Sequence, residues 1–234
     1  MGYPCSVSFI SALLTPAVGA LFLTACAPVG PPTGIVTQVE GKVSVSMLLR
    51  DVHLKVAMVR KGTHGRKVVR PMKPRYITIH STQNYTAGAA RHSLALKRGA
   101  LRSPKRREGN RIGYLIWHFT VDERMAIQHM PTSEQGEHAD FGGPGNRLSI
   151  GIEMCEERGS NVQATIERTA KLTAVLMKKH GIPLRGVVPH YHWPRKGKRV
   201  QHKNCPHFLL DNGKPGRKWR AFQNKVNFYY RKLE

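Results

Sequence analysis

The first 39 residues of this chain carry no Asp, Glu, Lys or Arg, and this absence of charge divides the sequence into two parts. The other part, residues 40–234, contains 38 Lys and Arg against 14 Asp and Glu, which gives a net charge of +24. Within the uncharged part, residues 7–23 are almost entirely apolar or small. Such a run near the start of a chain is typical of an export signal. An uncleaved membrane anchor is the alternative, because the run approaches the ~20 residues that span a bilayer.

The apolar run ends in the sequence LTAC at residues 23–26, which resembles a bacterial lipobox, in which the cysteine is acylated and becomes the first residue of the mature protein. The sequence departs from that pattern at residues 1–6, which lack the usual Lys or Arg. We expect a lipoprotein-type export signal over residues 1–26, which removes Cys5, with Cys26 as the candidate lipidation site. The protein would then work in the periplasm or cell envelope, anchored to the membrane through Cys26.

Residues 27–70 precede the first clear folding signals. They begin with a Pro- and Gly-rich stretch at 28–34, which indicates a tether, and continue with mixed apolar and basic residues that show no clean period. The role of this second stretch is left open. Strand and helix patterns follow one another over residues 71–234, so we expect one folded domain there. Four cysteines in the chain exclude a disulfide-dense scaffold.

Short runs of β-branched and apolar residues predict strands, and apolar residues spaced three or four apart predict helices. The expected strands lie at residues 76–80, 115–121, 125–129, 149–155 and 187–190, and the expected helices at 87–96, 163–180 and 218–232. The helix at 163–180 has the clearest pattern, because basic residues occupy its last turn and Gly181 follows it. Strands that alternate with helices indicate the α/β class.

Three residues far apart in the sequence, His80, His190 and Cys205, have side chains that zinc accepts as ligands. A catalytic zinc site uses three protein ligands and a water molecule, and imidazole nitrogen and thiolate sulfur are common donors. Spacing alone gives this set little support, because the chain contains 12 histidines. From the residues alone, His80 could equally be a locally bonded residue at a strand end, and Cys205 a small buried thiol.

Five strings of the sequence resemble one protein family in residues and in order. They are YITIHST at 76–82, WHFTVDE at 117–123, GPGNRLSIGIEMC at 143–155, VVPHYHW at 187–193 and KNCP at 203–206. The family is that of the zinc-dependent N-acetylmuramoyl-L-alanine amidases of the type-2 class, which includes phage endolysins and animal peptidoglycan recognition proteins. The resemblance implies an α/β fold with a central mixed β-sheet flanked by helices. It also implies a zinc amidase domain over residues 71–234 that ends in a basic helix.

The resemblance implies one Zn²⁺ ion per chain, held by His80, His190 and Cys205. His192 lies two residues beyond His190 and would share its face if the strand continued. The family pattern favours His190, so His192 is expected to be a nearby group. Cys155 is expected to be a buried strand residue instead of a ligand.

The family has a catalytic glutamate in the IGIE string, here Glu153, and a lysine just before the cysteine ligand, here Lys203. Amide hydrolysis needs a group that takes a proton from the attacking water and delivers it to the leaving amine, and the resemblance gives this role to Glu153. A cation at Lys203 would stabilise the negative charge that develops on the carbonyl oxygen. From the residues alone, an ion-paired surface glutamate and one more solvated lysine would be the ordinary interpretations.

Two further residues are expected to line the substrate groove. Trp117 occupies the place of a tyrosine in amidase-type phage lysozyme, and endolysins of the class often have Trp there. This favours a packing or groove-lining role for Trp117. His138 resembles a histidine of the family's groove and is a candidate for substrate contact.

The substrate that the resemblance implies is peptidoglycan or its muropeptide fragments, cut at the amide between N-acetylmuramic acid and L-alanine. Basic stretches at 102–111, 195–203 and 214–232 would hold such an enzyme, expected to be a monomer, on an anionic cell-wall or lipid surface. Nucleic acid also attracts basic proteins. No nucleic-acid partner is expected, because the sequence shows no common nucleic-acid-binding motif. A non-catalytic peptidoglycan receptor of the same fold is less favoured, because receptors of the family typically lack the cysteine ligand.

Overall fold

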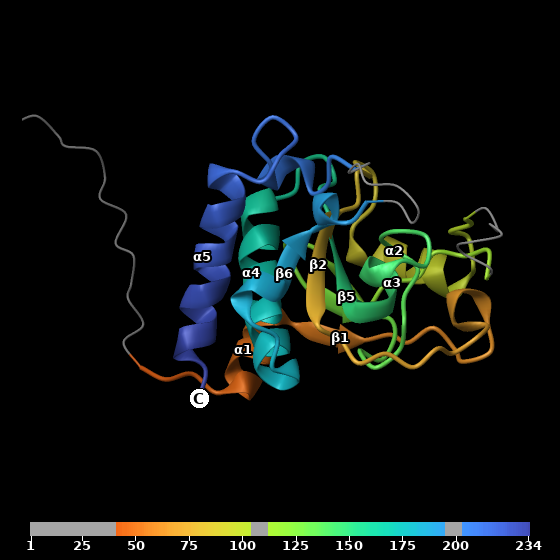
Figure 1. Ribbon diagram of the computed structural model, residues 1–234, viewed down its shortest axis with the longest axis horizontal. Helices are drawn as coiled ribbons and strands as arrows, with labels where there is room; N and C mark the ends of the chain where they lie inside the picture. Colours follow the sequence, from red (N-terminus) through yellow and green to blue (C-terminus); the bar gives the residue numbers. More distant parts are fainter. Residues whose placement is uncertain (1–40, 104–111, 195–202) are drawn as a thin grey trace, which may run out of the picture. The chain divides into compact units, whose positions relative to one another are not determined.

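A mixed six-stranded β-sheet lies at the centre of the structure, with helices on both of its faces (Figure 1). The computed structural model describes residues 41–103, 112–194 and 203–234. These residues belong to one compact unit, Glu40–Glu234. The expected export signal, the tether and Cys26 lie outside the described residues and stay predictions. Within the described ranges, no helix combines the length and apolar character that crossing a membrane requires.

The strands are short and follow the order β1-β4-β3-β5-β2-β6 across the sheet. β3 and β4 are antiparallel, and the other neighbouring pairs are parallel. The strands are β1 (Leu54–Val56), β2 (Tyr76–Ser81), β3 (Phe119–Val121), β4 (Ala126–Gln128), β5 (Ser149–Met154) and β6 (Val187–Pro189). This arrangement confirms the predicted α/β class and the predicted mixed sheet.

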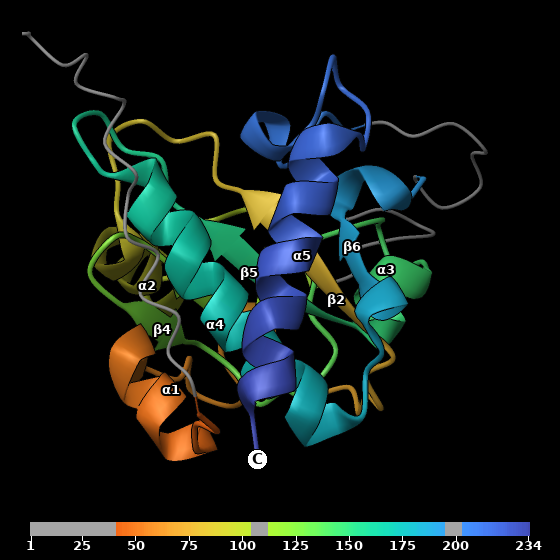
Figure 2. The ribbon, with the colours of Figure 1, turned by 90° about the vertical axis from the view of Figure 1, so that its left-hand side faces the viewer.

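Five α-helices of the described residues cover the sheet: α1 (Val45–Val52), α2 (Ala89–Lys97), α3 (Pro144–Leu148), α4 (Val162–His180) and α5 (Arg217–Lys232). On one face, α4 packs between α1 and α5 (Figure 2). On the other face, α2 contacts β3 and β4, and α3 contacts β2 and β5 (Figure 1). The sheet is therefore the middle of three layers.

The helix with the clearest sequence pattern forms as predicted. Asn161 caps the start of α4, because its side chain accepts a hydrogen bond from the backbone N–H of Ala164 at 3.0 Å. Basic residues occupy the last turn of α4, where they complement the helix dipole. Gly181 ends the helix with a φ of 63°, a left-handed conformation that favours glycine.

The main core lies between the sheet and the layer of α4 and α5. β2 and β5 contribute side chains that solvent does not reach, namely Ile77, Ile79, Ile150 and Ile152. The two helices contribute Leu172, Leu176, Trp219, Phe222 and Val226. The apolar side that the pattern predicts for the last helix is thus buried, and its burial on the sheet stabilises that helix.

Two predicted strands differ from the observed ones. The strand predicted at 115–121 is wrong in its first half, because β3 begins at Phe119. The backbone N–H groups of Leu115 and Ile116 donate to the loops at Leu101 and Glu137, so these two residues bond to loops instead of a strand. The strand predicted at 187–190 ends one residue early, and His190 begins a 3-10 turn that extends to His192.

The segment that the sequence left open adds one helix and one strand to the unit. The side chain of Ser44 caps α1 by accepting from the N–H of Met47. β1 then pairs with β4 at the edge of the sheet. The backbone of Val43 also bonds to the end of α5, where its N–H donates to Lys232 at 2.8 Å. Residues 43–56 are therefore part of the folded unit.

We expect Leu48→Ala to lower the free energy of unfolding by about 2–5 kcal/mol, because this α1 side chain is buried against α4 and its removal leaves a cavity. Met47→Ala is the matched control, since Met47 lies on the same helix and is 50% exposed, and it should change stability by less than about 0.5 kcal/mol. Urea unfolding followed by circular dichroism measures both. Equal effects of the two substitutions would mean that α1 does not pack on the domain.

Candidate metal centre and substrate pocket

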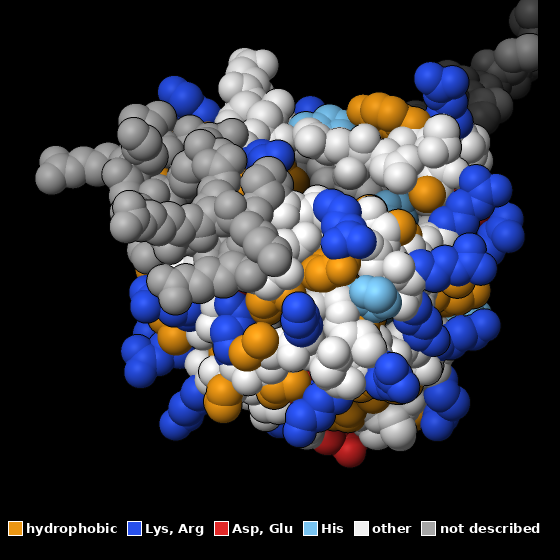
Figure 3. Space-filling model, turned by 90° about the vertical axis from the view of Figure 1, so that its right-hand side faces the viewer, with side chains coloured by type: hydrophobic (Ala, Val, Ile, Leu, Met, Phe, Trp, Pro, Cys, Tyr) orange, Lys and Arg blue, Asp and Glu red, His pale blue; other side chains and the backbone are white. Residues whose placement is uncertain are grey.

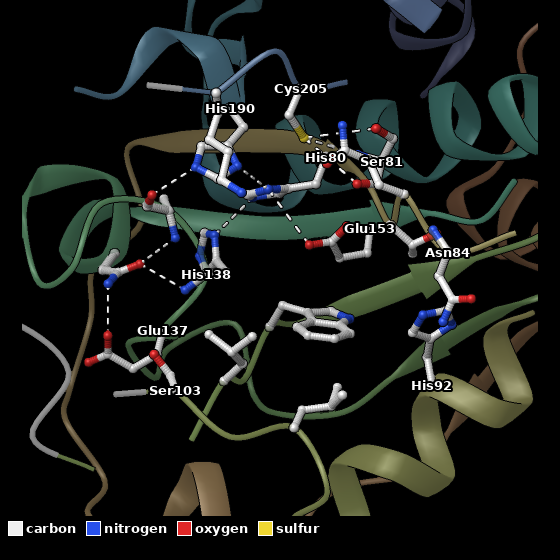
Figure 4. Close-up of a pocket in the computed structure, with 18 of the residues that line it drawn as sticks. His80, Ser81, Asn84, His92, Ser103, Glu137, His138, Glu153, His190 and Cys205 are labelled. Carbon is white, nitrogen blue, oxygen red and sulfur yellow. Dashed lines mark hydrogen bonds and ion pairs between the residues drawn. The ribbon is translucent and has the colours of Figure 1, made fainter. Parts of the chain in front are cut away.

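The site lies where the carboxyl ends of parallel strands meet at one edge of the sheet, the usual place for a ligand in an open α/β sheet (Figure 4). His80 is near the end of β2, and its Cα is paired with that of Glu153 on β5. His190 directly follows β6, which pairs with the other side of β2. The loop before α5 adds Cys205. Four residues that are distant in sequence thus reach one edge.

His80, His190 and Cys205 form a cluster that could hold a metal ion. Their three candidate ligand atoms lie within 4.8 Å of one another, and all three residues are buried. The Nδ1 atoms of His80 and His190 are 2.9 Å apart. The sulfur of Cys205 accepts a hydrogen bond from the backbone N–H of Ser81 at 3.3 Å. The structure therefore brings together the ligand set that the sequence suggested.

The hydrogen bonds on the far side of each imidazole determine where its proton sits. His190 Nε2 lies 2.7 Å from the carbonyl oxygen of Ala139, which can only accept, so Nε2 carries the proton. His138 Nε2 donates to the carbonyl of Ser149, so His138 Nδ1 accepts from His80 Nε2 at 3.0 Å. The lone pairs on Nδ1 of neutral His80 and neutral His190 therefore face each other. Two facing lone pairs repel unless a cation lies between them, so this donor geometry fits a metal ion.

Burial controls the charge of the candidate ligands. It lowers the pKa of His80 well below its ordinary value and keeps the imidazole neutral. It raises the pKa of the Cys205 thiol to about 12, and the nearby carboxyl group of Glu153 adds to that rise. A thiolate in this place therefore needs a cation beside it. Two neutral imidazoles and a metal-stabilised thiolate are donors that zinc prefers.

Glu153 faces the ligand cluster. Its Oε1 lies 3.7 Å from Nδ1 of His80, and its side chain is 14% exposed. Among the described residues, its buried Oε2 has no hydrogen-bond partner. Burial raises the pKa of Glu153 to about 8, and the positive charge of Lys203 opposes the rise. The structure thus places Glu153 beside the metal ligands, not on the surface in an ion pair.

Lys203 lines the same pocket, although its side chain is also open to solvent. Its charge acts on Glu153 and on Cys205, because it lowers the pKa of both groups. The lysine is therefore close enough to influence the protonation of Glu153 and Cys205, which a lysine in an isolated surface loop would not be.

The pocket has a volume of about 490 Å³ and extends from the candidate metal ligands to Leu101, Arg102 and Ser103. Trp117 is buried in its wall, and its Nε1 donates to Thr120 Oγ1 at 2.7 Å. This agrees with the packing or lining role expected for Trp117. His138 also lines the pocket, but its imidazole hydrogen-bonds to His80, so its main contact is with a candidate ligand.

His192 and Cys155 lie outside the cluster. The side chain of His192 is exposed and rests against Tyr76 and Trp193. It points away from His190 because a 3-10 turn of three residues per turn separates neighbours at i and i+2, whereas a strand would align them. Cys155 is buried, and burial raises the pKa of its thiol, as expected for a structural residue.

Sequence reasoning missed two groups that support the ligands. The carbonyl of Ala139 could not be found from a side-chain pattern, because any residue offers one. Asn146 was visible inside the GPGNRLSIGIEMC string, but nothing in the string indicated that its side chain bonds the loop holding His138.

Another buried histidine, His118, lies behind the site. His118 Nδ1 accepts from the backbone N–H of Gly151 at 2.9 Å, and Nε2 donates to the carbonyl of Glu134 at 2.9 Å. Both ring nitrogens are therefore used by the neutral form. Burial lowers the pKa of His118 to about 4.

The comparisons place these features among known proteins. A family model described as N-acetylmuramoyl-L-alanine amidase matches residues 70–208. The chain is 37% identical over 158 residues to the amidase CwlH of Bacillus subtilis, covering 67% of this chain and 54% of the relative. It is 39% identical over 155 residues to the amidase XlyA of the same organism, covering 65% of this chain and 44% of the relative. The chain thus spans about half the length of these curated relatives.

Two solved structures share the fold. The catalytic domain of XlyA matches with a TM-score of 0.60 and 35% identity, covering 75% of this chain and 99% of that chain. A mutant endolysin from Bacillus subtilis matches with a TM-score of 0.61 and 36% identity, with the same two coverages. The sheet and helices described above therefore form the fold of amidase catalytic domains, as the sequence resemblance implied.

We expect the metal-free protein to lose stability as the pH falls from 7 to 5. The pKa of His118 is about 4 when folded, below the ordinary 6.5. The unfolded chain therefore binds more protons in this range, and His118 alone should cost about 2 kcal/mol. The contribution of His118 to the free energy of unfolding is fully present above pH 6.5 and is lost as the pH falls towards 4. Urea unfolding with chelator at several pH values measures this. The free energy of unfolding should fall less steeply with decreasing pH for His118→Gln than for the wild-type protein, and equal slopes would contradict the role given to His118.

Proposed function

The chain belongs to the N-acetylmuramoyl-L-alanine amidase family, and on that premise we propose that it hydrolyses the amide between N-acetylmuramic acid and the L-alanine of the peptidoglycan stem peptide. The observation that carries the proposal is the buried cluster of His80, His190 and Cys205, with Glu153 facing it across one pocket. A purely structural cluster would not need a buried carboxyl group whose Oε1 lies 3.7 Å from a ligand imidazole and whose Oε2 has no hydrogen-bond partner among the described residues.

We propose that the cofactor is Zn²⁺, one ion per chain. His80 and His190 would hold it through Nδ1, and Cys205 through its sulfur, because these are the atoms that face one another. A bound zinc ion polarises an amide carbonyl and acidifies water, which are the two requirements of amide hydrolysis near neutral pH.

Glu153 would carry the proton. A carboxylate Oε takes a proton from the attacking water as the new C–O bond forms, and it gives that proton to the amide nitrogen as the C–N bond breaks. In the metal-free protein, burial raises the pKa of Glu153 to about 8 and Lys203 opposes the rise. A cation bound beside it would lower that pKa, so that the carboxylate form is available to accept a proton. Lys203 would place its positive charge near the carbonyl oxygen and stabilise the oxyanion.

A non-catalytic peptidoglycan receptor is the alternative use of this fold. A receptor needs the pocket but not the thiol or the carboxylate. Cys205 and Glu153 both face the His80 side of the pocket, and they support hydrolysis over binding alone.

We expect the purified protein to bind one zinc ion and to release stem peptides with a free L-alanine amine from muropeptides. Cys205→Ser should lower both zinc affinity and activity by more than about 100-fold, because even outer-shell changes cost ~10–100-fold. His192→Ala is the matched control and should change neither. Metal analysis and mass spectrometry of the digestion products measure the two effects.

Glu153→Gln separates chemistry from metal binding. It should keep the zinc and slow hydrolysis by roughly 10²–10⁴-fold, because only the proton carrier is lost. Activity that survives both chelation and Cys205→Ser would rule out the mechanism.

We further propose that a basic face beside the pocket binds a phosphate-bearing anionic polymer of the cell wall. Residues 52–103 contain 12 Lys and Arg and no Asp or Glu. Arg66 and Arg70 pair with acidic residues from other segments. Figure 3 looks onto the side of the molecule that carries α2, where Lys and Arg side chains spread over the surface and acidic side chains show only near its lower edge. Such a surface attracts a polyanion.

We expect Lys61→Glu with Lys97→Glu to weaken binding to a soluble phosphodiester polymer and to reduce the salt dependence of binding by about one to two counterions. Both side chains are exposed. Lys218→Glu with Arg231→Glu changes two exposed residues of α5, in the separate basic stretch at 214–232, by the same net charge and measures how much that stretch contributes. Titrations at several salt concentrations compare the pairs. Equal weakening by the two pairs would mean that only net charge matters, and preference for anionic vesicles would favour a lipid surface.

A further inference from the structure

One short loop touches both candidate histidine ligands. The loop runs from Glu137 to Asp140, between β4 and α3. The imidazole of His138 accepts a hydrogen bond from Nε2 of His80, and the backbone carbonyl of Ala139 accepts one from Nε2 of His190. The outward nitrogens of two ligands from different strands are thus bonded to consecutive residues.

The imidazole of His138 sits in a slot made by two glycines. A Cβ atom built on Gly151 of β5 would lie 2.8 Å from the ring, and one built on Gly136 would lie 2.7 Å from it. Any larger residue at Gly151 would push the ring away from His80. The ring is therefore held between a strand and its own loop, in the orientation that lets Nδ1 accept from His80.

The side chain of Asn146 fixes the backbone of the same loop. Its Oδ1 accepts from the N–H groups of His138 and Ala139, at 2.9 and 2.8 Å. Its Nδ2 donates to Oε2 of Glu137 at 2.9 Å, and the other oxygen of Glu137 accepts from Arg70. Asn146 is 1% exposed, so water cannot replace these bonds.

We propose that Asn146 is a positioning residue for the metal centre, because through the loop Glu137–Asp140 it sets the tautomer and orientation of both His80 and His190. Both Nδ1 lone pairs face inward only while both Nε2 protons have their acceptors. The side-chain amide of Asn146 thus orients both histidine ligands in the metal-free protein. The inference rests on the proposed zinc function, and it adds a residue that touches neither metal ligand directly.

The first test measures zinc affinity by competition with a chromogenic chelator. Asn146→Ala should raise the zinc dissociation constant about 10–100-fold, the cost usual for outer-shell partners. In the metal-free protein, two-bond ¹H–¹⁵N spectra of the imidazoles should show His80 and His190 protonated on Nε2, and mixed tautomers after Asn146→Ala. Asn161→Ala is the matched control, because it removes the cap of α4 and should lower stability without changing the zinc dissociation constant.

A second pair of variants keeps the inference testable if Asn146→Ala does not fold. His138→Gln retains an oxygen that can accept from His80, whereas His138→Phe retains the ring volume without an acceptor. We expect near-normal zinc affinity for the first and a loss of about 10–100-fold for the second. Equal affinities for this pair, or a folded Asn146→Ala with wild-type affinity and tautomers, would overturn the inference. Absence of zinc binding by the wild-type protein would instead overturn the proposed function.

Discussion

The parallel pairing of β2 with β5 and β6 is the constraint on which the rest of the site depends. Its register places His80 opposite Glu153, and β6 delivers His190 one residue after Pro189. Because side chains alternate between the faces of a sheet, a slip of one residue would turn His80 into the opposite layer. The buried isoleucines on β2 and β5 oppose such a slip, since it would move them out of the core.

The same burial that stabilises the strands makes the site need a cation. Without metal, burial keeps His80 neutral, keeps the thiol of Cys205 protonated, and raises the pKa of Glu153 to about 8. Each of these shifts costs free energy relative to water, and one divalent ion among the ligands offsets several of them together. If zinc binds as proposed, folding and metal binding would be linked in this domain.

The predicted fold was correct where a segment was long or strongly patterned. α4 and α5 carry an apolar side and basic last turns, and α4 also has a capping residue at each end, all of which local chemistry dictates. α1 and β1 gave too little signal, because α1 has only eight residues and β1 has three at the edge of the sheet, where Val56 is exposed. Residues 115–118 look like a strand by composition, but the backbone N–H groups of Leu115 and Ile116 donate to loops from elsewhere in the chain.

By itself, the sequence determined which donors the site contains: two imidazoles, a thiolate and a carboxylate, each in a string that resembles the amidase family. It also determined the strong positive charge, which is a matter of composition. The tertiary structure decided which histidine of the pair His190 and His192 faces inward, because the chain turns after Pro189 instead of continuing as a strand. It likewise decided that Asn146 and a backbone carbonyl support the ligands. These contacts join residues distant along the chain, and no local pattern of residues encodes them.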